Sequence, residues 1–278
     1  MTAMAEAGLN WLVVKRDTFI RSEADRSFHS IPGNYAIVRG DDETVLGIVG
    51  SHYTPLQNVD AFHFFDRFLA ERGGKYERAG CLYRGGRVWL MARLPRNIQL
   101  PNGENIEEHA ILVNSHDGDS RVAYGFVGVR ELNGTVLQLA ESDYEAFGGI
   151  RHRRNVARNV MATSELGEQA QSAFGRALDS FSKMTADRMG PDVARAYFRK
   201  VYRRPAGTKW RAEDKVMAGF EVSPEKTLWA AYGVVIAQED FKPYYAEDSV
   251  SRRLAHVWWG IGAKVKYRAL VCAEQLVR

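Results

Sequence analysis

The chain has 278 residues, of which 45% are hydrophobic and 26% are charged, and its net charge at pH 7 is +4. These values exclude a largely disordered chain and suffice for a sizeable core. No stretch reaches the roughly 20 apolar residues of a membrane span, the first residues do not resemble a secretory signal, and the two cysteines lie far apart. We therefore expect a cytoplasmic protein without a disulfide framework or membrane anchor.

The first half of the sequence predicts short strands joined by tight turns, with one helix among them. Each expected strand pair flanks a turn rich in Gly, Asp, Asn or Pro, which is the pattern of a β-hairpin. Apolar residues recur every three or four positions over residues 59–71, which predicts an amphipathic helix. The expected hairpins pair residues 35–39 with 44–49, 77–83 with 87–93, 97–100 with 106–114, and 122–129 with 135–140.

The second half predicts helices. An apolar stripe from Leu166 to Met184 ends near Gly190-Pro191, and Ser223-Pro224 begins a helix that runs to about Gln238. A final long helix begins at Ser249 or Ser251, with Leu254, Trp258, Ile261, Val265 and Leu270 on or near one face.

The order of these elements sets the expected fold class. Strands come first and helices follow without alternation, so we expect an α+β fold in which a hairpin, a helix and antiparallel strands form a sheet and the C-terminal half is helical. We expect residues 1–278 to form a single domain. A candidate sub-boundary near residues 147–150 would separate a strand-rich core (1–147) from a basic helical part (148–278).

The charge is unevenly distributed along the chain. Residues 1–150 carry −5, residues 151–215 carry +8 and residues 216–278 carry +1. A basic block of this kind favours a polyanionic partner, although a solvated helical face fits it equally well.

Two clusters within the basic block are candidate nucleic-acid-binding sites. Arginine and lysine neutralise phosphates, and an aromatic ring such as that of Trp210 can stack on a base, although Trp210 can also be a core residue. The candidates are Arg151, His152, Arg153, Arg154 and Arg158 in the first cluster, and Arg199, Lys200, Arg203, Arg204, Lys209, Trp210 and Arg211 in the second.

Motifs of catalysis are missing from the sequence. It has no phosphate-binding GxxxxGK[ST] loop, no GxSxG and no HExxH, so we expect neither an enzyme nor a cofactor. One polar cluster, His116, Asp117 and Asp119, has ligands suited to Mg²⁺ or Mn²⁺. The same residues also read as a turn between two strands, which we favour.

Five stretches in order resemble a known family. They are IPGNYAIVR (31–39), VLGIVGSHYTPLQN (45–58), RVWLMARLP (87–95), ILVNSHDG (111–118) and TLWAAYGVV (227–235). This order is similar to that of the phage/plasmid-like proteins of the domain-of-unknown-function family nine-three-two. The resemblance implies a shared fold and an origin in a mobile element, and it brings no catalytic residue. The sequence departs from the family pattern at Glu131-Leu132 and is more basic than usual at residues 150–155.

A more distant resemblance concerns the phage single-strand annealing proteins RecT, Red-beta and Erf. Their order of hairpin, helix, antiparallel strands and helices, with a basic groove for single-stranded DNA, is similar to the order predicted above. This resemblance implies an ATP-independent single-stranded DNA-binding and annealing protein that acts in homologous recombination as a homo-oligomer (ring, arc or filament), with no membrane partner. A metal-dependent nuclease and a host-directed protein-interaction module remain as alternatives.

Overall fold

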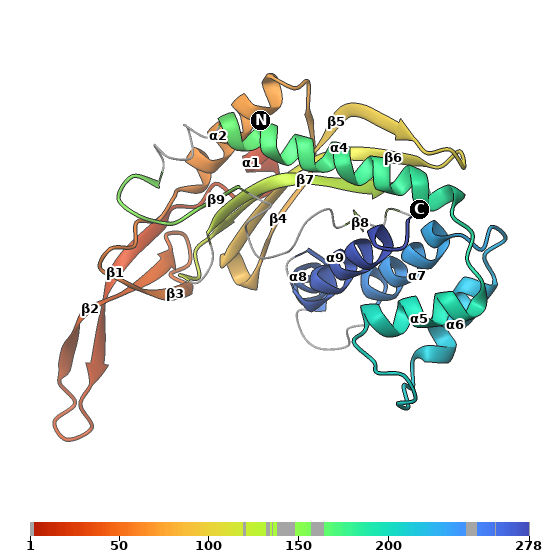
Figure 1. Ribbon diagram of the computed structural model, residues 1–278. Coiled ribbons are helices and arrows are strands. Elements are labelled where there is room, and N and C mark those ends of the chain that lie inside the picture. Colours follow the sequence, from red (N-terminus) through yellow and green to blue (C-terminus); the bar gives the residue numbers. More distant parts are fainter. Residues whose placement is uncertain are drawn as a thin grey trace. The chain divides into compact units, whose positions relative to one another are not determined.

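The computed structural model describes residues 3–118, 121–131, 134, 136–137, 148–156, 164–242, 249–258 and 260–277. Strands dominate the first half and helices the second, which confirms the α+β class (Figure 1). The chain forms two compact units. Unit 1 comprises Met1–Leu94, Ala110–Gly125 and Gly148–Gly167, and unit 2 comprises Pro95–His109, Phe126–Phe147 and Glu168–Arg278.

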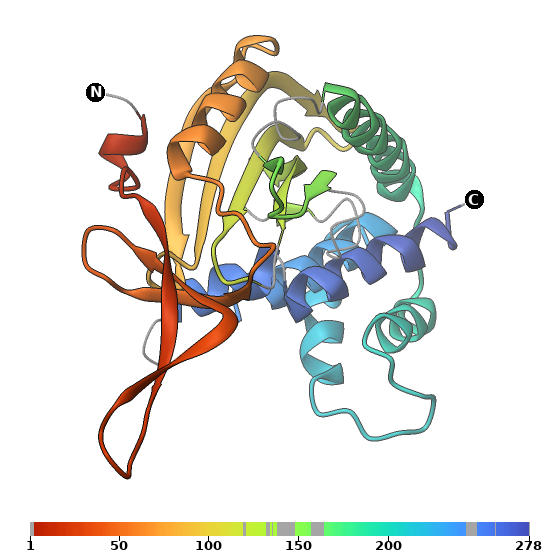
Figure 2. The same cartoon turned by 90° about the vertical axis from the view of Figure 1, so that its left-hand side faces the viewer.

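Unit 1 begins with a short helix, α1 (Ala3–Glu6), and an antiparallel sheet with the strand order β1-β2-β3. Its strands are β1 (Val13–Arg21), β2 (Phe28–Arg39) and β3 (Val45–Gly50). The β2–β3 hairpin was expected, whereas β1 was not. Because β3 pairs only with residues 34–38 of β2, the outer parts of β1 and β2 continue as a two-stranded arm, residues 18–33 (Figures 1 and 2).

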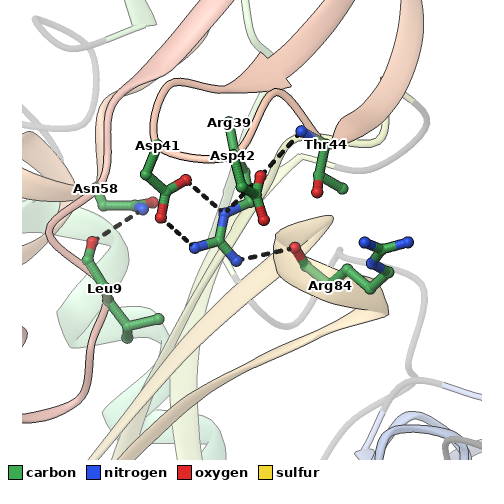
Figure 3. A network of polar contacts seen from close by, with 7 residues as sticks. All are labelled: Leu9, Arg39, Asp41, Asp42, Thr44, Asn58 and Arg84. Atoms are coloured by element: carbon green, nitrogen blue, oxygen red, sulfur yellow. Dashed lines mark hydrogen bonds and ion pairs between the residues drawn. The ribbon is translucent and has the colours of Figure 1, made fainter.

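At the end of β2 away from the arm, the guanidinium of Arg39 holds the first sheet to its surroundings (Figure 3). Its Nε and Nη2 donate to the two carboxylate oxygens of Asp41 at 3.0 and 2.6 Å, and its Nη1 donates to the carbonyl oxygen of Arg84 at 3.3 Å. The same guanidinium lies 4.6 Å from the ring centre of the buried Trp11. The expected turn at residues 40–42 is therefore fastened to the next hairpin of unit 1.

A second sheet has the strand order β4-β5-β6-β7-β8, and β9 pairs with β7. Its strands confirm the expected hairpins, except that residues 135 and 138–140 of the last one lie outside the described residues. Strands β5, β6 and β7 contribute residues to both units. In unit 1 the aromatic side chains Phe62 and Phe65 of helix α2 (Asn58–Ala70) pack on Tyr76 of β4, with ring centres 6.0 and 5.9 Å apart. The strands are β4 (Lys75–Leu82), β5 (Arg87–Gln99), β6 (Asn105–Ser115), β7 (Val122–Arg130), β8 (Val136–Leu137) and β9 (Gly148–Ile150), with the turn η1 (Tyr83–Gly85) between β4 and β5.

Unit 2 is mainly helical. Its last helix, α9, packs against α5, α7 and α8. The rings of Phe181, Trp229 and Tyr232 lie 5.1 to 5.8 Å from one another and form part of the core. None of the helices that the structure describes is long and apolar enough to cross a membrane. The helices are α4 (Ser164–Ala186), α5 (Pro191–Val201), α6 (Glu213–Glu221), α7 (Leu228–Asp240), α8 (Ser249–Trp258) and α9 (Ile261–Glu274).

Two expected helix boundaries in unit 2 are wrong. Helix α7 begins at Leu228 because Thr227, and not Ser223, is the N-cap, its hydroxyl accepting from the amide of Ala230 at 3.2 Å. The expected final helix is two helices, which meet near Gly260. Ile261 therefore opens a new helix and is 73% exposed instead of lying on the apolar face.

Candidate functional site

Unit 1 contains a cleft of about 600 Å³, which is within the usual size range of ligand-binding sites. Its walls come from β2 and β3, from the loop after β3, from the turn between β6 and β7, and from the segment after β9. The lining residues are Gly33, Ile48, Val49, Gly50, Ser51, His52, Tyr53, Gly118, Arg121, Arg151, His152 and Arg153.

Three arginines give this cleft its charge. Arg151 and Arg153 are exposed and Arg121 is half-buried, and in the part of the chain that the structure describes no aspartate or glutamate lines the cleft. Nearby, Asp117 pairs with Arg87 at 3.0 Å, so its carboxylate is already balanced by a cation. The cleft is therefore suited to an anionic group, because arginine binds phosphate and carboxylate oxygens through several donors at once.

The loop after β3, residues 51–54, is held in place by hydrogen bonds and a ring contact with other segments of unit 1. The ammonium of Lys15 donates to the carbonyl oxygens of Ser51 and Tyr53 at 3.0 Å each. The Tyr53 hydroxyl donates to the carbonyl of Ser115 at 3.1 Å, and its ring stacks on that of His152 with ring centres 4.9 Å apart. The amide of Thr54 donates to the carbonyl of His152 at 3.1 Å. These contacts hold the segment that carries Arg151 and Arg153 against the rest of the cleft.

Two glycines allow β3 and the turn at residues 117–118 to pack closely together at the floor of the cleft. A Cβ atom on Gly47 would lie 2.4 Å from the carbonyl oxygen of Asp117, and one on Gly118 would lie 2.8 Å from Cγ1 of Val49. Gly118 also has a φ of 86°, which is strained for other residues. The turn expected at residues 117–118 thus packs directly on β3, at a distance that only glycine permits.

A layer of buried polar groups lies behind the cleft. His116 is fully buried, and one of its ring nitrogens, Nε2, lies 2.9 Å from Oδ1 of Asn58. The amide nitrogen of Asn114 donates to the carbonyl of Leu56 at 3.0 Å. Burial lowers the pKa of His116 to about 3 and that of His152 to about 4. Both imidazoles are therefore neutral at pH 7, and the positive charge of the cleft comes from its arginines.

The same geometry bears on the alternative of a metal site. His116 points into the protein interior, where Asn58 binds it, and Asp117 pairs with Arg87. The third expected ligand, Asp119, lies outside the described residues. Within the described ranges no group of three or more His, Cys, Asp or Glu side chains is arranged to hold a metal ion.

The first basic cluster of the sequence is divided by the fold. Arg151 and Arg153 line the cleft, and Arg154 is exposed beside them. His152, expected as a contact for nucleic acid, is instead 95% buried, with its ring against Tyr53. Arg158 lies outside the described residues.

The second basic cluster belongs to unit 2, at the end of α5 and in the connection to α6. The guanidinium of Arg199 is occupied there: Nε donates to Glu213 at 2.8 Å, and Nη1 donates to the carbonyls of Pro205 and Thr208 at 2.8 and 3.2 Å. Trp210 is half-buried with its ring centre 5.0 Å from that of Tyr202. The exposed members of the cluster are Lys200, Arg203, Arg204, Lys209 and Arg211.

Sequence reasoning missed several residues of the cleft. Arg121 is the only Lys or Arg between residues 97 and 129, and Lys15, which holds the loop after β3, belongs to the strand that was not expected. Tyr53 lies in a stretch that was quoted only for its family resemblance. Each was a weak signal by itself, because the cleft is assembled from segments up to about 120 residues apart.

Comparison with known proteins gives one positive result. No curated protein and no solved structure matches the chain. The model of the family described as a domain of unknown function (DUF932) matches residues 45–258, which include most of the cleft. Because this match covers well over half of the chain, the protein belongs to the DUF932 family.

Proposed function

We propose that the protein binds single-stranded DNA and anneals complementary strands without ATP, in the cytoplasm and in the recombination of a phage or plasmid. The observation that carries this proposal is the cleft of unit 1, which three arginines line and to which no acidic side chain of the described residues contributes. Phosphates are the anions that such a site meets in repeating order along a polynucleotide, and arginine binds them with little regard to sequence.

The fixed walls of the cleft support the same proposal. Lys15 and the Tyr53–His152 stack hold the segment of Arg151 and Arg153 in place, so little ordering is needed when a phosphate binds. The buried imidazoles of His116 and His152 are neutral at pH 7, so they neither repel a cation nor attract a phosphate.

The exposed cations of unit 2 provide further phosphate contacts. Lys200, Arg203 and Arg204 follow one another at the end of α5, and Lys209 and Arg211 come shortly after them. Arg199 makes no such contact in this proposal, because Glu213 and two carbonyls already satisfy its guanidinium. A protein that holds the backbone in this way leaves the bases free to pair, which is what annealing requires and which needs no hydrolysis.

Binding is tested with labelled oligonucleotides of single-stranded DNA, double-stranded DNA and single-stranded RNA, by fluorescence anisotropy between about 50 and 200 mM salt. We expect single-stranded DNA to bind and its affinity to fall about tenfold or more over this range, because counterions are released on binding. The double variant Arg151→Ala/Arg153→Ala should bind more weakly and lower the salt slope by about 0.7 to 1 per lost contact.

The matched control for this variant is Arg67→Ala/Lys75→Ala, which removes the same charge from exposed positions of unit 1 outside the cleft. It should bind as the unchanged protein does. Equal loss in both double variants would mean that net charge and not the cleft governs binding. Absent or salt-independent binding would contradict the proposal and favour a protein-interaction module.

Annealing is tested with two complementary oligonucleotides, one carrying a fluorophore and the other a quencher. We expect the protein to accelerate quenching without ATP and in the presence of EDTA. If EDTA abolishes the activity and Mn²⁺ restores it together with strand cleavage, the nuclease alternative replaces this proposal, and His116→Ala is then the variant to examine.

A further inference from the structure

The arm of unit 1 leaves one edge of a sheet uncovered. Among the described strands, β1 pairs only with β2 and is therefore the last strand of its sheet. An uncovered strand edge is a template for pairing with another chain, and apolar side chains on it increase that tendency. Phe19 is 56% exposed, Ile20 60% and Phe28 71%. A two-stranded hairpin with such side chains in water is of marginal stability unless something covers it.

The charge of the arm disfavours nucleic acid as its cover. Residues 18–33 contain two arginines, Arg21 and Arg26, and two acids, Glu23 and Asp25. The acid Asp25 stays ionised, because hydrogen bonds from Ser22 and Ser27 lower its pKa to about 2. A surface whose positive and negative charges balance gains little binding free energy from contact with a polyanion.

One face of β1 has a charge pattern that is complementary to itself. The pairing with β2 shifts register between Asp17 and Phe19, and the extra residues of this shift are in β2, where the partner changes from Tyr35 to Ser30. Strand β1 therefore keeps its alternation, and Asp17, Phe19 and Arg21 share a face. Asp17 and Arg21 make no ion pair with any residue in the described part of the chain. When such a strand lies antiparallel to its own copy with Phe19 opposite Phe19, each Asp17 stands opposite an Arg21.

The hydrogen-bonding groups of the edge fit this register. At the base of β1 the amide and carbonyl of Val13 are turned away from β2 and bond to the side chain of Gln57 at 2.9 and 2.8 Å. Beyond the register shift the amide of Ser22 donates to the carbonyl of Ser27 at 2.8 Å, so even-numbered residues bond to β2 there and the main-chain groups of Phe19 and Arg21 face outward, as those of Asp17 do. Gln57 thus covers the edge at Val13 and leaves its outer part free.

We propose that β1 pairs with β1 of a second copy of this chain, antiparallel and about a two-fold axis at Phe19. The contact forms two Asp17–Arg21 ion pairs and one Phe19–Phe19 pair, and it joins the two three-stranded sheets edge to edge. Such a contact is isologous and closes on two copies, so a larger assembly needs another surface. The inference rests on the arm and is independent of the nucleic-acid proposal.

Charge exchange tests the pairing. Asp17→Arg and Arg21→Asp each place like charges opposite one another, and each should weaken dimerisation about tenfold, measured by light scattering over a dilution series without DNA. The double variant Asp17→Arg/Arg21→Asp restores opposite charges and should dimerise as the unchanged protein does. The control is Arg16→Asp, which makes the same change on the other face of β1 and should leave dimerisation unaffected.

Cysteine crosslinking tests the register and does not depend on the charge variants. Opposed residues of a hydrogen-bonded antiparallel pair have Cα atoms about 5.5 Å apart, which a disulfide spans. Phe19→Cys should therefore crosslink two copies on mild oxidation, whereas Ile20→Cys should not, because residue 20 faces residue 18 of the copy. The unchanged protein controls for its own Cys81 and Cys272.

Three results would overturn the inference. One is a monomer at every concentration in the absence of DNA. Another is equal crosslinking of Phe19→Cys and Ile20→Cys, which would mean that arms meet in a different register or at random. The third is failure of the charge-exchanged double variant to regain dimerisation although its circular dichroism matches that of the unchanged protein.

Discussion

A buried ion pair in unit 2 gives a sharp test of how its helices are held. The Lys266 side chain of α9 is fully buried, and its ammonium lies 2.7 Å from Oδ1 of Asp240 and 3.0 Å from the carbonyl oxygen of Val136. The other carboxylate oxygen of Asp240 accepts from the amide of Val136 at 2.9 Å. The pair thus fixes strand β8 to helices α7 and α9.

The perturbation is Asp240→Asn, which keeps the shape of the side chain and removes its charge. Lys266 then has no counter-charge in a buried site, and loss of one partner of a buried pair costs about 3–5 kcal/mol in the free energy of unfolding. The exposed change Asp214→Asn is the matched control and should cost less than about 0.5 kcal/mol. The double variant Lys266→Met/Asp240→Asn should lose less than Asp240→Asn alone, because no charge is left buried.

The pH dependence has a definite sign. Burial lowers the pKa of Lys266 below its ordinary 10.5, and the charge of Asp240 opposes that effect. When Asp240→Asn removes the opposing charge, the pKa of folded Lys266 falls further, and the folded chain binds fewer protons than the unfolded chain up to pH 10.5. Stability of the variant should therefore rise with pH, by at most about 1.4 kcal/mol per pH unit, until the unfolded lysine also loses its proton.

The measurement is urea unfolding, followed by tryptophan fluorescence, from neutral pH to about pH 10. We expect the difference in the free energy of unfolding between Asp240→Asn and the unchanged protein to decrease as the pH rises. The difference between Asp214→Asn and the unchanged protein should not change with pH. A constant gap, or a variant that is as stable as the unchanged protein at pH 7, would refute the reasoning and mean that water reaches Lys266.

Two further predictions concern a glycine and an ion pair. Gly118→Ala should lower the melting temperature more than Gly103→Ala does. Both glycines have a φ of 86°, but only at Gly118 would the new Cβ atom contact neighbouring atoms. Equal decreases in melting temperature would mean that β3 and the turn at residues 117–118 move apart to make room for the methyl group. Glu213→Gln should lower the melting temperature at pH 7. Hydrogen bonds from Arg199 lower the pKa of Glu213 below 4.5, so the ionised carboxylate stabilises the fold above that pH and this stabilisation is lost as the pH falls below it. The difference in melting temperature between Glu213→Gln and the unchanged protein should therefore shrink in acid. A difference that persists at low pH would contradict this account.

Local patterns were enough to predict the hairpins and helix α2. The turn at residues 40–42 and the apolar spacing of residues 59–71 are signals that neighbouring residues carry by themselves. Strand β1 was missed because its outer residues do not alternate between apolar and polar: Phe19 and Ile20 are both exposed. The alternating pattern that identifies a strand arises when one of its faces is buried. The outer part of β1 has no buried face within the chain, so its sequence does not alternate.

Helices α5 and α6 were missed for a related reason. Their sequence is dominated by charges, which we interpreted as a surface for nucleic acid. Several of these charges serve the fold, since Arg195 and Arg199 both pair with Glu213, and Tyr197 and Phe198 between them are buried. Pairing of an arginine with an acid some 14 residues away depends on how the two helices meet, which the local sequence does not state.

The position of the cleft illustrates why net charge alone does not locate a binding site. Residues 151–215 carry +8, yet Arg199 within them is neutralised by its own unit. Residues 1–150 carry −5, yet they supply Arg121 to the cleft, and their Asp117 is paired with Arg87. A cation is available to an anionic ligand only where the fold brings no acid to it. Among the described residues of the cleft, Arg121, Arg151 and Arg153 meet that condition, although their positions in the sequence do not suggest that they belong together.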